Sequence, residues 1–158
     1  MNPDMCVPCG EGLVNIRAGA LIVRDGKLLM VKSGRGYYYS VGGRLKFGET
    51  AEDAVVREVF EETGVKLKAG RLAFVQENYF ANDTPAKLGK PVYEIGFYFR
   101  MEVPPDFEPV RMTVDEGESS ERLCWVSPDA LETLYPEAFR SEALRPSPEV
   151  KHFVKDDR

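Results

Sequence analysis

Apolar residues alternate with other residues from Val14 to Val23, and a second apolar run follows from Lys27 to Val31. A period of two is typical of strands. The two runs are joined by Asp25-Gly26, and an Asp-Gly pair in this position indicates a β-hairpin. The aromatic segment Tyr37 to Val41 is also strand-like, but Gly42-Gly43 follows it at once. We therefore predict a hairpin and then a strand that runs into a loop.

The pattern changes to that of a helix between Thr50 and Thr63. Thr50 is followed three positions later by Asp53, which predicts a capping box at the start of the helix. Gly64 stands where a left-handed residue commonly ends a helix. At about 100° per residue, four apolar side chains share one arc and predict the packed face of this helix: Val55, Val56, Val59 and Phe60.

The second half of the chain also divides into predicted strands and helices. We expect strands at 71–80 and 92–103, separated by a polar loop at 81–91. Further along, the sequence predicts a loop at 104–120, a strand at 122–126, a helix opened by Ser127-Pro128 at 127–134 and resuming after Pro136, and a loosely ordered tail beyond Pro146. This order indicates an α/β fold in which helices sandwich a mixed central sheet.

Composition indicates one globular domain. The chain has 158 residues, of which 43% are hydrophobic, enough for a substantial core. Its 26 acidic and 21 basic side chains give a net charge of -5, so we expect no nucleic-acid polymer as a partner. No stretch approaches the ~18 apolar residues of a membrane span, and we expect a cytoplasmic protein without a membrane partner.

The three cysteines are interpreted as reduced thiols, because Cys6, Cys9 and Cys124 cannot all pair within one chain. Cys6 and Cys9 form half of a zinc-ribbon pattern, which only Cys124 and His152 could complete to four ligands. Free thiols are the favoured interpretation. Trp125 is expected in the core, and His152 is expected at the surface.

The candidate chemistry lies on the helix. Glu58, Glu61 and Glu62 share an arc about 100° wide, and only Arg57 stands four positions before Glu61 to offset this charge. Like charges four residues apart destabilise an isolated helix, whereas hard divalent cations favour several carboxylate oxygens. The cluster therefore predicts a metal site. Taken without its context, such a cluster is more often a solvated acidic face than a metal site.

The loop before the helix suits a phosphate group. Gly42-Gly43 and Gly48 permit tight turns and a close approach of the backbone to a phosphate, and the following helix N-terminus favours negative charge. Four nearby cations are candidates to neutralise phosphate oxygens, or else are simply solvated: Lys32, Arg35, Arg44 and Lys46.

The spacing of these residues resembles the complete Nudix box. Gly43 is followed after five residues by Glu49, after seven more by Arg57-Glu58-Val59, and then by Glu61-Glu62 and Gly64-Val65, each after one residue. The resemblance implies a Nudix-like α/β/α sandwich. It also implies a hydrolase that uses Mg²⁺ or Mn²⁺ to let water attack phosphorus in the diphosphate linkage of a nucleoside diphosphate derivative.

The resemblance assigns roles within the box. Glu58, Glu61 and Glu62 would bind the metal, with Gly43 beside them, while Glu49 would assist the metal site or the attacking water and Arg57 would orient a carboxylate. The general base stays open between five candidates: Glu49, Glu62, Glu116, Glu118 and Glu121. Just before the box, Tyr39-Ser40-Val41 departs from the tryptophan and proline that many members carry, a segment that helps to shape the pocket.

Substrate binding is assigned to Arg35, Arg44, Lys46, Tyr39 and Tyr79, of which the two tyrosines could stack on a base or simply pack in a strand. The substrate candidates are a nucleotide sugar such as ADP-ribose, a nucleoside triphosphate and a dinucleoside polyphosphate. The alternative is a domain that senses a nucleotide without cleaving it. We interpret 1–12 as a flexible segment, 13–145 as the Nudix domain and 146–158 as a tail, and the oligomeric state stays open, a homodimer included.

Overall fold

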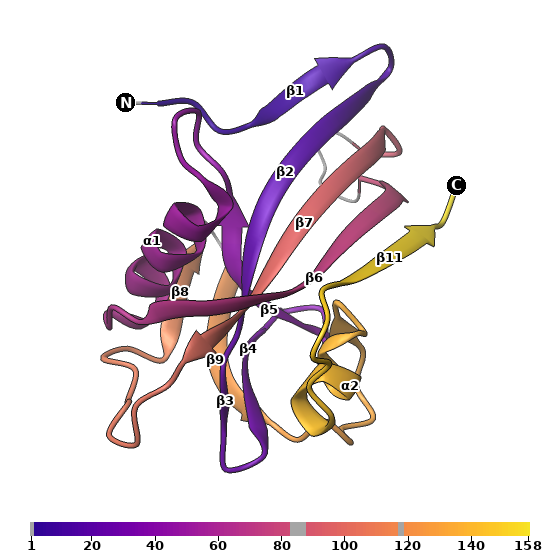
Figure 1. Cartoon of the computed structure of the whole chain (residues 1–158). Coiled ribbons are helices and arrows are strands. Elements are labelled where there is room, and N and C mark those ends of the chain that lie inside the picture. The colour runs from indigo at the N-terminus through magenta and orange to yellow at the C-terminus, as the bar shows by residue number, and fades with distance from the viewer. Residues whose placement is uncertain (1, 83–87, 117–118) are drawn as a thin grey trace.

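The computed structural model describes residues 2–82, 88–116 and 119–158. Its strands form one 11-stranded mixed sheet with the order β11-β6-β7-β2-β5-β4-β9-β8, to which β1, β10 and β3 are attached at the side (Figure 1). The strands are β1 Cys6–Cys9, β2 Gly12–Leu21, β3 Val23–Arg24, β4 Lys27–Lys32, β5 Tyr38–Arg44, β6 Lys68–Ala81, β7 Pro91–Glu102, β8 Thr113–Glu116, β9 Ser119–Val126, β10 Leu134–Tyr135 and β11 Lys151–Asp156. The helices are α1 Ala51–Thr63 and α2 Phe139–Leu144.

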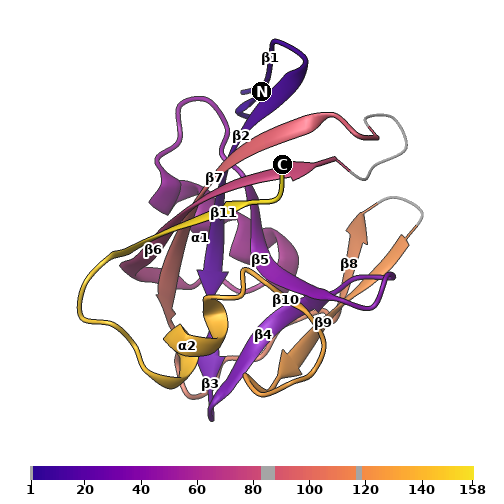
Figure 2. The same ribbon diagram turned by 90° about the vertical axis from the view of Figure 1, so that its right-hand side faces the viewer.

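Both faces of the sheet are covered, as a strand with apolar residues on both sides requires. In β4, Leu29 and Val31 pack into the core beneath α1, whereas Leu28 and Met30 pack into a second core that includes Phe139 of α2. The two helices accordingly lie on opposite sides of the sheet (Figure 1 and Figure 2). This arrangement confirms the predicted α/β/α sandwich with a mixed central sheet.

The central helix has the predicted ends. Thr50 and Asp53 form a reciprocal capping box, and Gly64 ends the helix with a φ of 76°. The packed face differs from the prediction, because Phe60 is 53% exposed while Glu62 is buried. At about 100° per residue, Phe60 falls outside the arc of the buried residues Ala54, Val55, Val59, Glu62 and Thr63, so apolar content alone did not identify this face.

The paired glycines lie within a strand, so the predicted loop after Val41 is wrong. β5 continues through both glycines, and Gly42 pairs with Gly19 of β2 in the register. Gly42 has a φ of 154°, and a Cβ built on it would lie 2.2 Å from the carbonyl oxygen of Ala18. Such a contact is impossible for a side chain, so glycine is what permits β5 to run this close to β2.

The predicted helix at 127–134 is also wrong. Only the part after Pro136 is helical, as α2, while Leu134 and Tyr135 form β10 beside β5. The guanidinium of Arg140 donates hydrogen bonds to the carbonyls of Pro128, Ala130 and Glu132 at 2.6 to 2.7 Å. Because a distant side chain satisfies these carbonyls, the segment does not need helical hydrogen bonds.

Both terminal segments belong to the sheet. The segment beyond Pro146, predicted to be loosely ordered, contains β11, which pairs in parallel with β6 and packs Phe153 against Phe74 at 5.4 Å between ring centroids. Likewise β1 pairs with β2 inside the segment predicted to be flexible. The predicted loop at 104–120 contains β8, which pairs with β9. Residues 83–87 of the other predicted loop lie outside the described residues.

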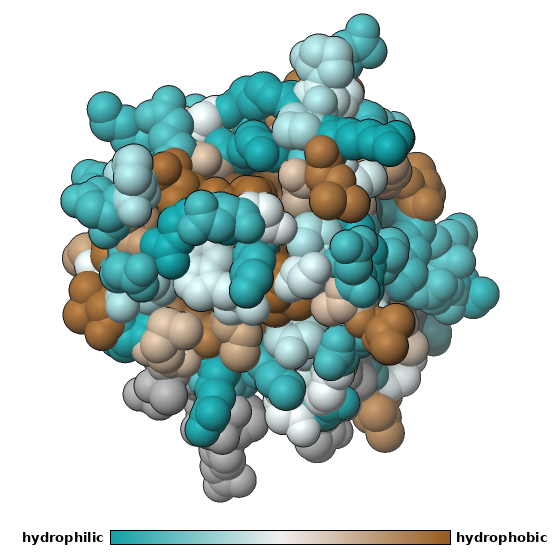
Figure 3. All heavy atoms as spheres, turned by 90° about the horizontal axis from the view of Figure 1, so that it is seen from below, coloured by the Kyte–Doolittle hydropathy of each residue, from teal (hydrophilic) through white to brown (hydrophobic). Residues whose placement is uncertain are grey.

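The surface in Figure 3 mixes hydrophilic and apolar side chains, with the apolar groups dispersed among the polar ones. Scattered apolar side chains of this kind are normal on a folded domain. In the described part of the chain, neither helix has the length and apolar character needed to cross a membrane.

Gly42→Ala should lower the free energy of unfolding by about 2–3 kcal/mol, because the new methyl group meets the β2 backbone and the strand keeps a strained φ. Urea unfolding measures this change. The matched control is Gly34→Ala, whose Cβ would meet nothing within 4 Å and which should change stability by less than about 0.5 kcal/mol. Equal losses in the two variants would contradict the close approach.

Candidate active site

One arginine connects the acidic residues of the loop and of the helix. The Nε of Arg57 donates to Glu49, its Nη2 donates to the same carboxylate at 3.0 Å, and its Nη1 donates to Glu58 at 2.7 Å. Nη1 also lies 3.4 Å from Glu61, and Nη2 donates to the carbonyl oxygen of Arg44 at 3.1 Å. Charge-assisted, partly bidentate bonds of this kind hold the loop before α1 against the helix.

The three helix carboxylates differ in their surroundings. The side chain of Glu58 is 15% exposed and that of Glu61 is 51% exposed, while Glu62 is buried. Burial raises the pKa of Glu58 although Arg57 opposes the shift, and the hydrogen bond from Arg57 lowers the pKa of Glu49. Within the described residues, no three acidic, histidine or cysteine side chains are gathered as a metal-holding group. The carboxylates line one side of α1 without converging on one point.

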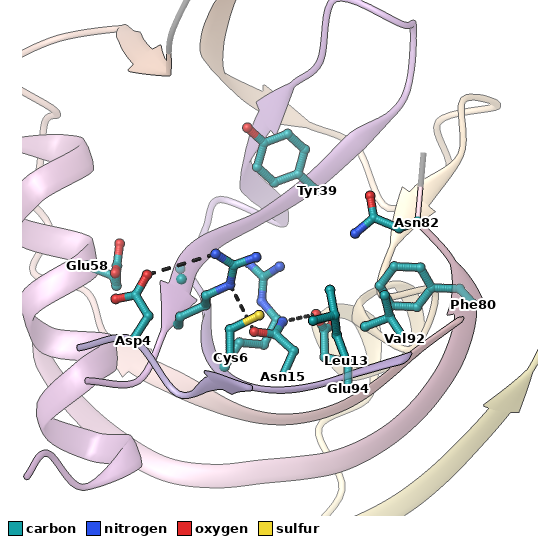
Figure 4. Close-up of a pocket in the computed structure, with 14 residues that line it drawn as sticks. Asp4, Cys6, Leu13, Asn15, Tyr39, Glu58, Phe80, Asn82, Val92 and Glu94 are labelled. Atoms are coloured by element: carbon teal, nitrogen blue, oxygen red, sulfur yellow. Dashed lines mark hydrogen bonds and ion pairs between the residues drawn. The ribbon is translucent and has the colours of Figure 1, made fainter. Parts of the chain in front are cut away.

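A cavity of about 430 Å³ adjoins this cluster. Glu58 projects from α1 at one end of the cavity, while Phe80 and Val92 lie at the opposite end (Figure 4). Gly43 lines the same end as Glu58, and a Cβ built on this glycine would lie 2.5 Å from the Glu58 carboxylate. The glycine therefore makes room for the carboxylate at the cavity wall.

Polar side chains from three strands form the floor of this cavity. Arg44 donates from Nε to Asn15 at 2.9 Å, and Asn15 donates in turn to Glu94 at 2.6 Å (Figure 4). Arg17 also lines the cavity, and although burial lowers its pKa, nearby Glu94 and other acidic groups raise the pKa above its ordinary value. The site thus offers fixed cations and fixed hydrogen-bonding groups next to a carboxylate.

Sequence analysis missed Asn15, Arg17 and Glu94. The available signal was the polar pair Asn15 and Arg17, two residues apart in an otherwise apolar strand, which places both side chains on one face. The partner strand β7 lies almost eighty residues away in sequence, so no local pattern connects Glu94 to them.

A second cavity of about 570 Å³ shares Arg17, Tyr39, Phe80 and Glu94 with the first. Of its remaining lining, three residues come from β6 and one each from β5, β7, β9, β10 and β11. The hydroxyl of Tyr39 donates a hydrogen bond to Glu121 of β9, which also lines this cavity. The two cavities therefore form a two-lobed site whose lobes meet at the four shared residues.

The residues predicted to bind substrate separate into two groups. Tyr39 and Arg44 line the two-lobed site. Arg35 is exposed near the tip of the β4–β5 turn, and Lys46 donates its backbone N–H to Glu49 at 2.9 Å; neither lines a lobe. Tyr79 is also outside both lobes, because it packs against Tyr93 at 4.5 Å between ring centroids.

The remaining candidates lie as follows. Of the possible general bases, Glu118 lies outside the described residues and so does the side chain of Glu116. His152 is exposed and contacts Glu77 at 2.6 Å. Trp125 packs against the core beneath α1, as predicted. Cys6 lines the first lobe as a free thiol.

Comparison with known proteins shows similarity to one protein family. Residues 14–146 match the family profile described as NUDIX domain. Putative nudix hydrolase 1 of Caenorhabditis elegans is 44% identical over 71 residues, which are 40% of this chain and 20% of that protein. NAD-capped RNA hydrolase NudC of Haemophilus influenzae is 36% identical over 72 residues, which are 40% of this chain and 27% of that protein. The chain thus covers less than a third of either relative.

Solved structures resemble the whole fold. The crystal structure of an ADP-ribose pyrophosphatase from Streptococcus suis superposes with a TM-score of 0.56 and 22% identity, covering 89% of this chain and 98% of that chain. At this identity the likeness concerns the fold alone.

Arg57→Met should lower the free energy of unfolding at pH 7 by about 2 kcal/mol, because Glu49 and Glu58 lose their shared donor. The lowered pKa of Glu49 means that its contribution is present above its ordinary pKa of about 4.3 and is lost as the pH falls through the lower folded-state value. The difference between wild type and variant should therefore shrink from about pH 5 to about pH 3.

Urea unfolding across this pH range tests the expectation. Arg122→Met, which removes an exposed arginine on β9, is the matched control and should have little effect at any pH. An undiminished difference for Arg57→Met at the acidic end would show that the arginine acts by packing instead of by charge.

Proposed function

Because the chain belongs to the Nudix hydrolase family, we propose that it is a pyrophosphohydrolase that cleaves the diphosphate linkage of a nucleoside diphosphate derivative with Mg²⁺ or Mn²⁺. One observation carries this proposal. Glu58, Gly43 and the arginines at positions 17 and 44 border the same cavity, and Arg57 donates hydrogen bonds to both Glu58 and Glu49. An anionic group in this cavity would meet the Glu58 carboxylate, which suits a metal, and the arginine cations, which suit phosphate.

The chemistry of the residues fits a hard divalent cation, and the three carboxylates, which are not gathered at one point among the described residues, would turn toward one another to share it. Glu58, Glu61 and Glu62 would hold it, with Gly43 beside them, because carboxylate oxygens are the preferred ligands and the missing Cβ of Gly43 leaves the Glu58 carboxylate at the cavity wall. When bound, such a metal polarises a phosphoryl oxygen, neutralises the diphosphate and lowers the pKa of a water molecule. Arg57 currently bonds two of these carboxylates and would have to share them with the metal.

Other side chains would position the substrate. Arg44 is held by Asn15, which orients its guanidinium for a phosphate oxygen. Tyr39 lies at the junction of the lobes, where its ring could contact the group attached to the diphosphate. Arg35, Lys46 and Tyr79 lie outside the lobes, so their predicted contacts would require a substrate that extends beyond the cavity.

The surroundings of the candidate residues reduce the number that could act as the general base. Glu49 has a lowered pKa and is held by Arg57, which makes it a weak base and suits it to positioning. Glu62 is buried in α1, and Glu121 faces the second lobe beside Tyr39. We propose that the general base is either Glu62 or Glu121, and a single mutation of each residue would distinguish the two.

The relatives suggest which substrates to test. ADP-ribose, a nucleoside triphosphate and a dinucleoside polyphosphate are all diphosphate-containing nucleotides, and the similar proteins include an ADP-ribose pyrophosphatase and a hydrolase of NAD-capped RNA. The net charge of -5 favours the small molecules over a polynucleotide. A domain that binds the nucleotide without cleaving it is the competing proposal.

In a purified-protein assay with this panel, the double variant Glu61→Gln and Glu62→Gln should lose at least about 100-fold of the metal-dependent turnover, because two carboxylate ligands become neutral amides. Glu52→Gln, on the exposed first turn of the same helix, is the matched control and should retain wild-type turnover. Absence of turnover by the wild-type protein on every substrate, with either metal, would refute hydrolysis and favour sensing.

Gly43→Ala should weaken Mn²⁺ binding by about tenfold, because the new methyl group would displace the Glu58 carboxylate. The unfolding energy should change little, since the displaced atoms are the far end of a flexible side chain. Calorimetric titration with Mn²⁺ measures the affinity, and Gly34→Ala serves as the control. Unchanged Mn²⁺ affinity would place the metal away from Glu58.

A further inference from the structure

The short segment that precedes β1 is fixed beside the loop between β5 and α1. Its backbone forms an antiparallel bridge between Asp4 and Lys46. The N–H of Met5 donates to the carbonyl oxygen of Leu45 at 2.7 Å, and the carbonyl oxygen of Met5 accepts a hydrogen bond from the N–H of Ile16 at 3.0 Å. The Met5 side chain also packs against the core beneath α1. The position of Asp4 therefore depends on its neighbours and not on its own carboxylate.

The Asp4 carboxylate faces the cation that is proposed to bind a substrate phosphate. Its Oδ2 lies 3.9 Å from Nη1 of Arg44, and both side chains line the first lobe, at the same end as Glu58 (Figure 4). The side chain of Asp4 is 48% exposed and that of Arg44 is 45% exposed, so solvent reaches the pair. An ion pair this long and this exposed contributes little to stability. Its consequence is that a phosphate which approaches Arg44 also approaches a negative charge.

The first lobe as a whole is not cationic. Its ionised lining consists of three carboxylates and two guanidinium groups, which leave one negative charge in excess: Asp4, Glu58, Glu94, Arg17 and Arg44. Within the described part of the chain, hydrogen bonds reach the carboxylates of Glu58 and Glu94, but none reaches that of Asp4. Asp4 is thus the carboxylate of the lobe whose charge is least compensated by the protein.

We propose that Asp4 is a specificity-determining residue, which admits diphosphates esterified at both ends and disfavours those that end in a free phosphate group. This inference rests on the proposed function, because that function places the diphosphate in the first lobe. Each phosphate of a doubly esterified diphosphate carries one negative charge, whereas a free terminal phosphate carries close to one more above about pH 6. Beside Arg44, this additional charge would be repelled by Asp4.

The inference selects among the candidate substrates. It favours a nucleotide sugar or a dinucleoside polyphosphate, whose phosphates are all esterified on both sides, over a nucleoside triphosphate. Arg44 keeps its hydrogen bond from Nε to Asn15 whether or not Asp4 is charged, so the cation should stay in place when the carboxylate is neutralised. A change at Asp4 therefore alters the charge that the ligand meets and not the group that binds it.

Calorimetry with ADP and ADP-ribose in metal-free buffer with EDTA, at about pH 8, tests this inference without hydrolysis. The two probes share the nucleoside and the diphosphate, and they differ in whether the second phosphate is esterified. Asp4→Asn should strengthen ADP binding about fivefold and change ADP-ribose binding by less than about twofold. The gain for ADP should shrink when the salt concentration rises from about 0.05 M to about 0.5 M, because salt screens exposed charges.

Two control variants isolate the charge of Asp4. Asp4→Glu keeps the carboxylate and should bind both probes as the wild type does. Asp25→Asn removes the same charge from the exposed turn between β3 and β4, outside both lobes, and should leave both affinities unchanged. The unfolding temperature of Asp4→Asn should equal that of the wild type, because backbone hydrogen bonds hold this segment.

The outcomes distinguish this inference from the proposed function. An equal gain for both probes would overturn it, because Asp4 would then only compete with any phosphate for Arg44. Unchanged or weaker ADP binding in Asp4→Asn would also overturn it, even if the protein hydrolyses ADP-ribose. The predicted binding pattern without turnover in the metal-containing assay would support the role of Asp4 while refuting hydrolysis.

Discussion

The arrangement of the site depends on the bonds that Arg57 makes to carboxylates from two different segments. Glu49 belongs to the loop before α1 and Glu58 to the helix itself, and one guanidinium holds both at hydrogen-bonding distance. Without this cation, acidic side chains would crowd a half-buried surface at a considerable electrostatic cost. The same bonds hold the loop against the helix, so the loop and the acidic cluster keep fixed positions relative to each other.

A second constraint is steric, and it comes from the paired glycines of β5. Gly42 permits the strand to approach the backbone of β2, and Gly43 leaves space for the Glu58 carboxylate. Together they set how closely the helix, its carboxylates and the central strands pack. The spacing of the acidic motif thus has its effect only because the strand before it carries no side chains at these two positions.

The sheet explains why a few polar residues stand out. Strands covered on both faces are mostly apolar, as β4 is, and a polar group among them must find a partner. Asn15 and Glu94 bond each other, whereas Arg17 and Asn78 retain buried atoms with none. These unpaired atoms belong to residues that line the two lobes, where a bound molecule would supply the missing hydrogen-bond partners.

The sequence by itself determined the short hairpin of β3 and β4 at Asp25-Gly26, the ends of α1 and the spacing of the acidic motif, because turn chemistry, helix caps and helical periodicity involve neighbours within a few residues. It did not determine that the long strand before this turn, β2, pairs with β5 and β7 instead of β4. Nor did it determine the secondary structure of residues 127–134 or of the tail. Their backbone groups bond distant partners, Arg140 in one case and β6 in the other. The lobes, too, arise only when strands far apart in sequence pair in one register, so tertiary structure alone placed Arg17 beside Glu94.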